Sequence, residues 1–118
     1  MPYQLRIQSP DRLLVENYKN EMSHRLNTCE RGIEHMDKAV LLHEVSMVRQ
    51  RTLTLSSEQC VIDPIDRFEE AAIQTDPDME ELRERHRNLS NIIKNLTSFL
   101  EQSVSESDET TTGPARNR

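Results

Sequence analysis

Apolar residues recur at steps of three or four along the first half of the chain, directly after Ser9-Pro10-Asp11. That tripeptide is a helix start: serine caps, proline is preorganised for the first turn and aspartate suits the positive end of the helix dipole. No further proline occurs before Pro64. The steps are those of a coiled-coil seam, so the pattern predicts one long helix over about 10–51. Its seam comprises Val15, Tyr18, Met22, Leu26, Cys29, Ile33, Met36, Val40 and Met47.

The apolar surface widens over residues 39–48, beyond what a two-stranded coil would bury. Such a broad face indicates packing against at least two other helices, as in a bundle. We expect it to contact a protein partner. The residues that broaden it are Leu41, Leu42, Val45 and Val48.

The second half of the chain repeats the helix-start signal at Asp63-Pro64 and at Asp76-Pro77-Asp78. These signals predict a short helix over about 64–73 and a second main helix over 77–104. The last helix has an unbroken heptad pattern in which His86 occupies one seam position, either fixing the register or lying at the solvated end of the coil. The other seam residues are Met79, Leu82, Leu89, Ile93, Leu96 and Leu100. Five of these, Leu82, Leu89, Ile93, Leu96 and Leu100, are predicted to contact partner helices.

The predicted fold is therefore an elongated all-α coiled-coil or helical-bundle subunit with two main helices and a short helix between them. Residues 1–9 form an N-terminal arm, and residues 52–62 form a connector. Residues 105–118 lack apolar residues except Ala115, so an acidic, disordered tail is expected there.

Composition narrows the classes of function. Only 34% of residues are hydrophobic, 3% are aromatic and two are glycine, which is less than an ordinary globular domain contains. Phosphate-cradling loops need glycine, so most nucleotide-binding enzymes are excluded. Residues 58–118 carry fourteen acidic and seven basic residues, which argues against nucleic acid as a partner.

No group of residues in the sequence has the spacing of an active site or a metal site. Histidines 24, 35, 43 and 86 and the two cysteines, Cys29 and Cys60, form no i,i+4 histidine pair and no Cys-x-x-Cys. No serine or cysteine has a histidine at a diagnostic distance. We expect no catalytic residue, cofactor or metal, and we expect a protein that is not an enzyme.

The most specific short motif is Glu70-Ala71-Ala72-Ile73-Gln74-Thr75-Asp76-Pro77. It resembles the peptides that the homodimeric dynein light chain binds as an added β-strand. The resemblance implies that Gln74 is the anchor and that Ile73, Thr75 and Asp76 flank it. A second interpretation stays open, in which Ile73 ends one helix and Thr75 or Asp76 caps the next.

A fainter resemblance covers residues 41–51 and Thr54-Leu55, which are similar to a stretch of the small coiled-coil subunit of the spindle and kinetochore-associated complex. The leading hypothesis is a non-enzymatic coiled-coil subunit of a hetero-oligomeric assembly with a scaffold role, in the cytoskeleton, the spindle and kinetochore or vesicle trafficking. The alternative is an adaptor that presents residues 70–77 to a dynein light chain. No apolar stretch follows Met1 and none spans a bilayer, so we expect a cytoplasmic or nuclear protein that is not secreted.

Overall fold

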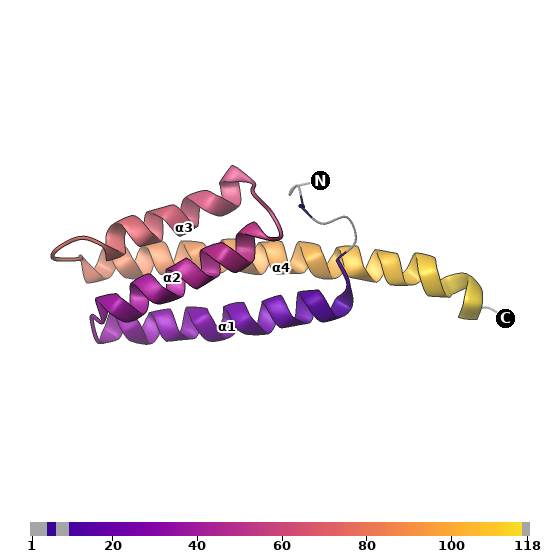
Figure 1. Cartoon of the computed structure of the whole chain (residues 1–118), viewed down its shortest axis with the longest axis horizontal. Coiled ribbons are helices and arrows are strands. Elements are labelled where there is room, and N and C mark those ends of the chain that lie inside the picture. Colours follow the sequence, from indigo (N-terminus) through magenta and orange to yellow (C-terminus); the bar gives the residue numbers. More distant parts are fainter. Residues whose placement is uncertain (1–4, 7–9, 117–118) are drawn as a thin grey trace.

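Four helices follow one another along the chain in the computed structural model: α1 (Arg12–Glu34), α2 (Lys38–Leu53), α3 (Gln59–Ala72) and α4 (Met79–Arg116). The structure describes the backbone of residues 5–6 and 10–116, and the side chains of these residues up to Val104. Helices α1 and α3 each pack against both α2 and α4. Consecutive helices run in opposite directions, so the four close around one shared core (Figure 1). This is an up-and-down helical bundle.

The predicted helix 10–51 is wrong, because the chain reverses at His35, Met36 and Asp37. Met36 adopts the left-handed conformation with φ 51°. The amide of Asp37 donates to the carbonyl of Gly32 (2.8 Å), and the amide of Met36 donates to the carbonyl of Ile33 (3.1 Å). These two bonds form a Schellman motif, a common way to end an α-helix. The Asp37 side chain then caps α2 by accepting from the amide of Val40 (3.2 Å).

Gly32 lies where the end of α1 meets the start of α2. A β-carbon placed there would stand 2.9 Å from Cδ2 of Leu41, and Leu41 is itself buried. The glycine therefore allows the two helices of the hairpin to approach closely.

Helix α3 begins at Gln59, earlier than the predicted start at 64, so Pro64 lies inside the helix. The predicted connector 52–62 is shorter in the structure, because α2 continues to Leu53 and α3 already begins at Gln59. Within it, Ser56 forms an isolated antiparallel bridge with Leu5. The amide of Arg6 donates to the carbonyl of Leu55 (2.7 Å). The N-terminal residues 5–6 are thereby fastened to the α2–α3 connection.

Helix α4 confirms the heptad pattern, because its apolar seam residues face the core and its last core residue is Val104. The helix extends to Arg116, past the predicted end at 104 and beyond the rest of the bundle (Figure 1). Side chains beyond Val104 lie outside the described residues, so the predicted disorder of the tail is not tested.

The all-α class is confirmed, and the elongated two-helix coiled coil is replaced by four helices packed on one another. The reason is that the chain supplies its own partner helices. The core takes residues from all four helices, and its largest fully buried side chains are Phe68, Met22, Ile33, Leu41, Leu55, Ile65, Leu82, Leu89, Leu96, Leu100, Val45 and Val48.

Candidate functional site

The residues predicted to meet a protein partner through the seams lie inside the bundle. Leu42 is half-buried and packs against the core, and the others are buried. The core that looked too small for a self-contained domain is completed by the chain's own four helices. A partner reaches these side chains only if the bundle opens. The buried members are Leu41, Val45, Val48, Leu82, Leu89, Ile93, Leu96 and Leu100.

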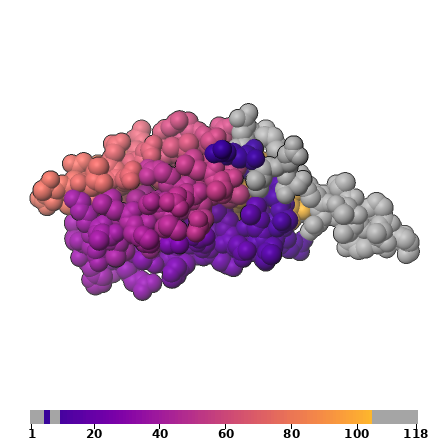
Figure 2. Space-filling view, viewed as in Figure 1, coloured from indigo at the N-terminus to yellow at the C-terminus, as the bar shows by residue number. Residues whose placement is uncertain are grey.

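The predicted peptide motif occupies the connection between α3 and α4. We call residues 73–77 the α3–α4 loop. Ile73 is the C-cap residue of α3 and 51% exposed, and Gln74, Thr75 and Asp76 are exposed. The loop protrudes at one end of the molecule (Figure 2). It is therefore the predicted contact segment that the folded chain leaves accessible.

Both ends of the α3–α4 loop are held by hydrogen bonds. The side-chain amide of Gln74 donates to the carbonyl of Glu70 (3.0 Å), which closes the last turn of α3. The carboxylate of Asp78 accepts from the amides of Glu80 (2.9 Å) and Glu81 (3.4 Å). Ile73 thus ends α3, as one interpretation had it, whereas Asp78 takes the capping role expected of Thr75 or Asp76.

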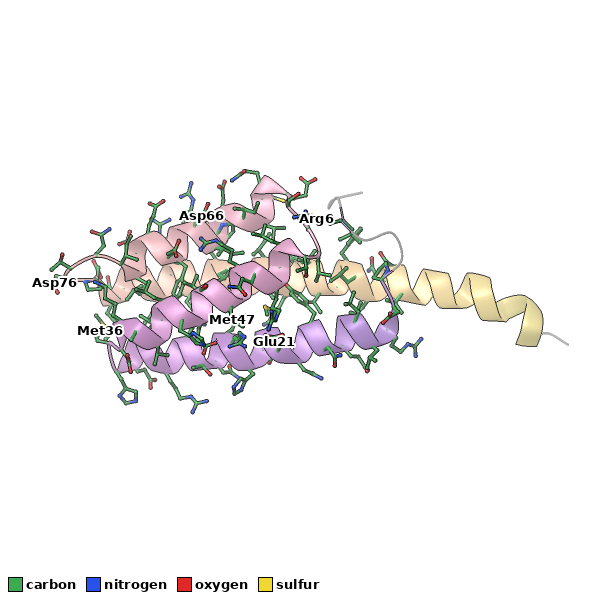
Figure 3. The ribbon with its side chains drawn as sticks, viewed as in Figure 1. Arg6, Glu21, Met36, Met47, Asp66 and Asp76 are labelled. Carbon is green, nitrogen blue, oxygen red and sulfur yellow. The ribbon has the colours of Figure 1, made fainter. Side chains whose placement is uncertain are left out.

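Lys38 fastens the loop to the other hairpin of the bundle, and sequence reasoning missed it. Its Nζ donates to the carbonyl of Gln74 (2.7 Å). Lys38 is the first residue of α2, so the α1–α2 turn and the α3–α4 loop lie at the same end of the bundle, as the labels of Met36 and Asp76 show (Figure 3). No sequence signal could have found this contact, because it joins a side chain to a backbone carbonyl 36 positions away.

A groove of about 460 Å³ runs beside the loop, between the end of α3 and the start of α4. Gln74 and Thr75 form part of its wall, so a segment bound to the loop would also contact it. Arg85 on the α4 side donates to Glu81 (3.2 Å). The charged residues of the wall are Arg67, Glu70, Asp76, Asp78, Glu81 and Arg85, which makes the groove more acidic than basic.

Polar side chains join the helices away from this end. Arg25 of α1 donates to Glu21 (2.9 Å) and to Glu44 of α2 (2.9 Å), and Arg51 donates to the same Glu21 (3.0 Å). Arg49 of α2 joins α3 through Asp66 (2.6 Å) and Glu69 (2.9 Å). These ion pairs fix how the helices align.

His86 contacts the core side of the bundle and does not lie at a solvated end of the coil. Its Nε2 lies 2.8 Å from the carbonyl oxygen of Leu26 on α1. Its ring stands edge-on to that of Phe68, with centroids 6.1 Å apart. His86 therefore links α4 to α1 and α3 as a half-buried structural residue.

The two cysteines differ in their surroundings. Burial raises the pKa of the Cys29 thiol to about 12, which keeps it protonated, whereas Cys60 is exposed. Among the described side chains no three His, Cys, Asp or Glu residues gather closely enough to hold a metal ion. Within the same part of the chain, no helix has the length and apolar character needed to cross a membrane.

Comparison with known proteins gave no relative. No protein-family model matches the chain, and neither a curated protein nor a solved structure matches it.

Proposed function

We propose that the chain is a non-enzymatic binding subunit of a larger protein assembly, and that it meets its partner through the α3–α4 loop. The observation that carries the proposal is the exposure of Ile73, an apolar side chain left 51% accessible beside three exposed polar residues. On an ordered loop, such an apolar side chain beside exposed polar groups offers a partner a surface to cover.

The partner that the motif favours is a dynein light chain, because the Ile-Gln-Thr-Asp segment resembles the peptides that a dynein light chain binds. Ile73 and Thr75 favour extended backbone, and Pro77 disfavours helix at Asp76. Strand addition to a sheet edge requires such a segment between ordered elements. An assembly in the cytoskeleton, at the spindle and kinetochore or in vesicle trafficking would suit such a partner.

The fold limits how much of the motif can extend without cost. Glu70, Ala71 and Ala72 belong to the last turn of α3, and Ala71 and Ala72 are buried. Extending them would remove two core residues and break the hydrogen bond between Gln74 and Glu70. Binding therefore uses residues 73–77 first, and the loss of the last α3 turn lowers the affinity of the complete motif.

Isothermal titration of the full chain with a purified dynein light chain tests the proposal. The dissociation constant of the Gln74→Ala variant should rise at least about tenfold, because the anchor is removed. Circular dichroism should show nearly unchanged helicity, since Gln74 lies outside α3 and its side chain bonds only the last turn of that helix.

Gln50→Ala is the matched control, because Gln50 is also exposed but lies on α2. It should bind like the original chain. Equal binding by Gln74→Ala would show that the loop is not the contact segment. Absence of binding by the unmodified chain would rule out a dynein light chain as the partner.

A further inference from the structure

The turn between α1 and α2 reverses a sequence that is also suited to one continuous helix. Residues 12–53 contain no proline and a single glycine, Gly32. Ile33, Met36 and Val40 keep the three-and-four spacing of a single helix face across the turn. The closed hairpin instead forces Met36 into the left-handed conformation at φ 51°, a position that glycine normally fills because a β-carbon is unfavourable there.

We propose that the chain has a second form, a domain-swapped dimer in which α1 and α2 join into one helix over residues 12–53. Helix α1 of each copy then leaves its own bundle and packs on α2 and α4 of the second copy. The same contacts form as in the closed monomer, because α1 packs on α2 and α4 there as well. Short hinges under strain favour this exchange of identical elements. The proposal rests on the hinge and is independent of the proposed function.

Two neighbouring residues set the balance between the forms in opposite directions. Met36 favours the dimer, since a continuous helix relieves its left-handed conformation. In the monomer Met36 is 40% exposed, so little packing holds it at the turn. Asp37 favours the monomer, since its carboxylate caps α2 only when α2 begins at Lys38. Inside a continuous helix Asp37 would cap nothing and would be a poor helix former.

Two variants therefore shift the oligomeric state in opposite senses. Met36→Gly places the preferred residue at the turn and weakens a continuous helix, so the dimer dissociation constant should rise at least about tenfold. Asp37→Ala removes the cap and favours the helix, so the dissociation constant should fall by about tenfold. Each protein is refolded from denaturant at high concentration and measured by size-exclusion chromatography with light scattering.

Asn91→Gly is the control. Asn91 is exposed in α4, which is unchanged between the two forms, so glycine there weakens a helix without touching the hinge. It should lower stability while leaving the dimer dissociation constant unchanged.

A native ion pair distinguishes a swapped dimer from any other dimer. Nζ of Lys19 on α1 lies 3.1 Å from the carboxylate of Glu101 on α4, and both side chains are about half exposed. A carbodiimide joins such a pair directly as an amide. In the closed monomer the bond forms within one chain, whereas in the swapped dimer it joins two chains.

Refolding a mixture of ¹⁴N- and ¹⁵N-labelled chains makes the difference visible by mass spectrometry. We expect the dimer fraction of Asp37→Ala to contain Lys19–Glu101 cross-links with one light and one heavy peptide. A dimer with only same-label cross-links would overturn the proposal. So would an Asp37→Ala protein that remains monomeric at every concentration.

Discussion

The hydroxyl oxygens of Tyr18 and Thr52 lie 2.9 Å apart in the buried interior, one on α1 and the other near the end of α2. The contact spans 34 positions of sequence and forms within one chain because the chain reverses at Met36. Each hydroxyl satisfies the other in a place where water is excluded. This hydrogen bond therefore fixes the position of α1 relative to α2 along the helix axes.

Tyr18→Phe should lower the free energy of unfolding by about 1–2 kcal/mol, because it leaves the Thr52 hydroxyl buried without its partner. The double variant Tyr18→Phe/Thr52→Val should recover part of that loss, since no polar group is then left unsatisfied. Urea unfolding monitored by circular dichroism measures both. An additive loss in the double variant would contradict the pairing.

Because Tyr18 is buried, we also expect the protein to lose stability at alkaline pH. Burial raises the pKa of Tyr18 from 10.0 to about 12, although the hydrogen bond to Thr52 lowers it in part. Between these values the unfolded chain has lost a proton that the folded chain keeps, so stability falls as the pH rises. The loss should reach about 2 kcal/mol near pH 12. Unfolding curves from pH 9 to 12 should show this fall in the original chain and a flatter profile in Tyr18→Phe.

Because of Glu21, we expect the free energy of unfolding to fall also in acid, as the pH decreases. Partial desolvation acts to raise the pKa of Glu21, but hydrogen bonds from Arg25 and Arg51 outweigh it and hold the pKa below 4.5. The unfolded chain therefore binds the proton first as the pH falls, and stability is lost with acidification. Glu21→Gln should cost less than about 1 kcal/mol at pH 7, and the difference should shrink toward pH 3. If Glu21→Gln remained less stable than the original chain at low pH, the charge of Glu21 would not be the source of the stabilisation.

The two cysteines should differ in reactivity. Cys29 is fully buried and keeps its proton, since burial raises its pKa to about 12, whereas Cys60 is exposed. A thiol reagent at pH 8 should therefore titrate one cysteine rapidly in the folded chain and both in guanidinium. Cys60→Ser should abolish the rapid phase. Rapid labelling of Cys29 in that variant would indicate that the bundle opens often.

Much of the helical pattern was predictable from local sequence. The seam residues from Val15 to Ile33 and from Leu82 to Leu100 face the core because a 3.6-residue period puts them on one face of any helix. That period does not reveal whether the opposing helix belongs to the same chain. The apolar face of α2 was therefore predicted to contact a partner protein. In the structure, α1 and α3 of the same chain cover it.

The reversal at Met36 was not predictable from the usual signals. Helices that end in a Schellman motif commonly carry glycine in the left-handed position, and here it is a methionine within an intact seam. The unbroken three-and-four spacing across the turn favoured a continuous helix, and the capping role of Asp37 is seen only in the structure. The α3–α4 loop was located correctly because Pro77 and Asp78 mark a helix start, whereas its tether to Lys38 depends on the tertiary fold.

A single chain closes its own apolar seams and leaves the α3–α4 loop accessible. Amide hydrogen exchange of the dilute, unbound chain, followed by mass spectrometry, tests it most directly. We expect strong protection for amides of α1 and of α4 up to Leu100, and rapid exchange at residues 74–76. Exchange of the α4 seam as fast as that of the loop, with protection gained only on adding a partner, would contradict it.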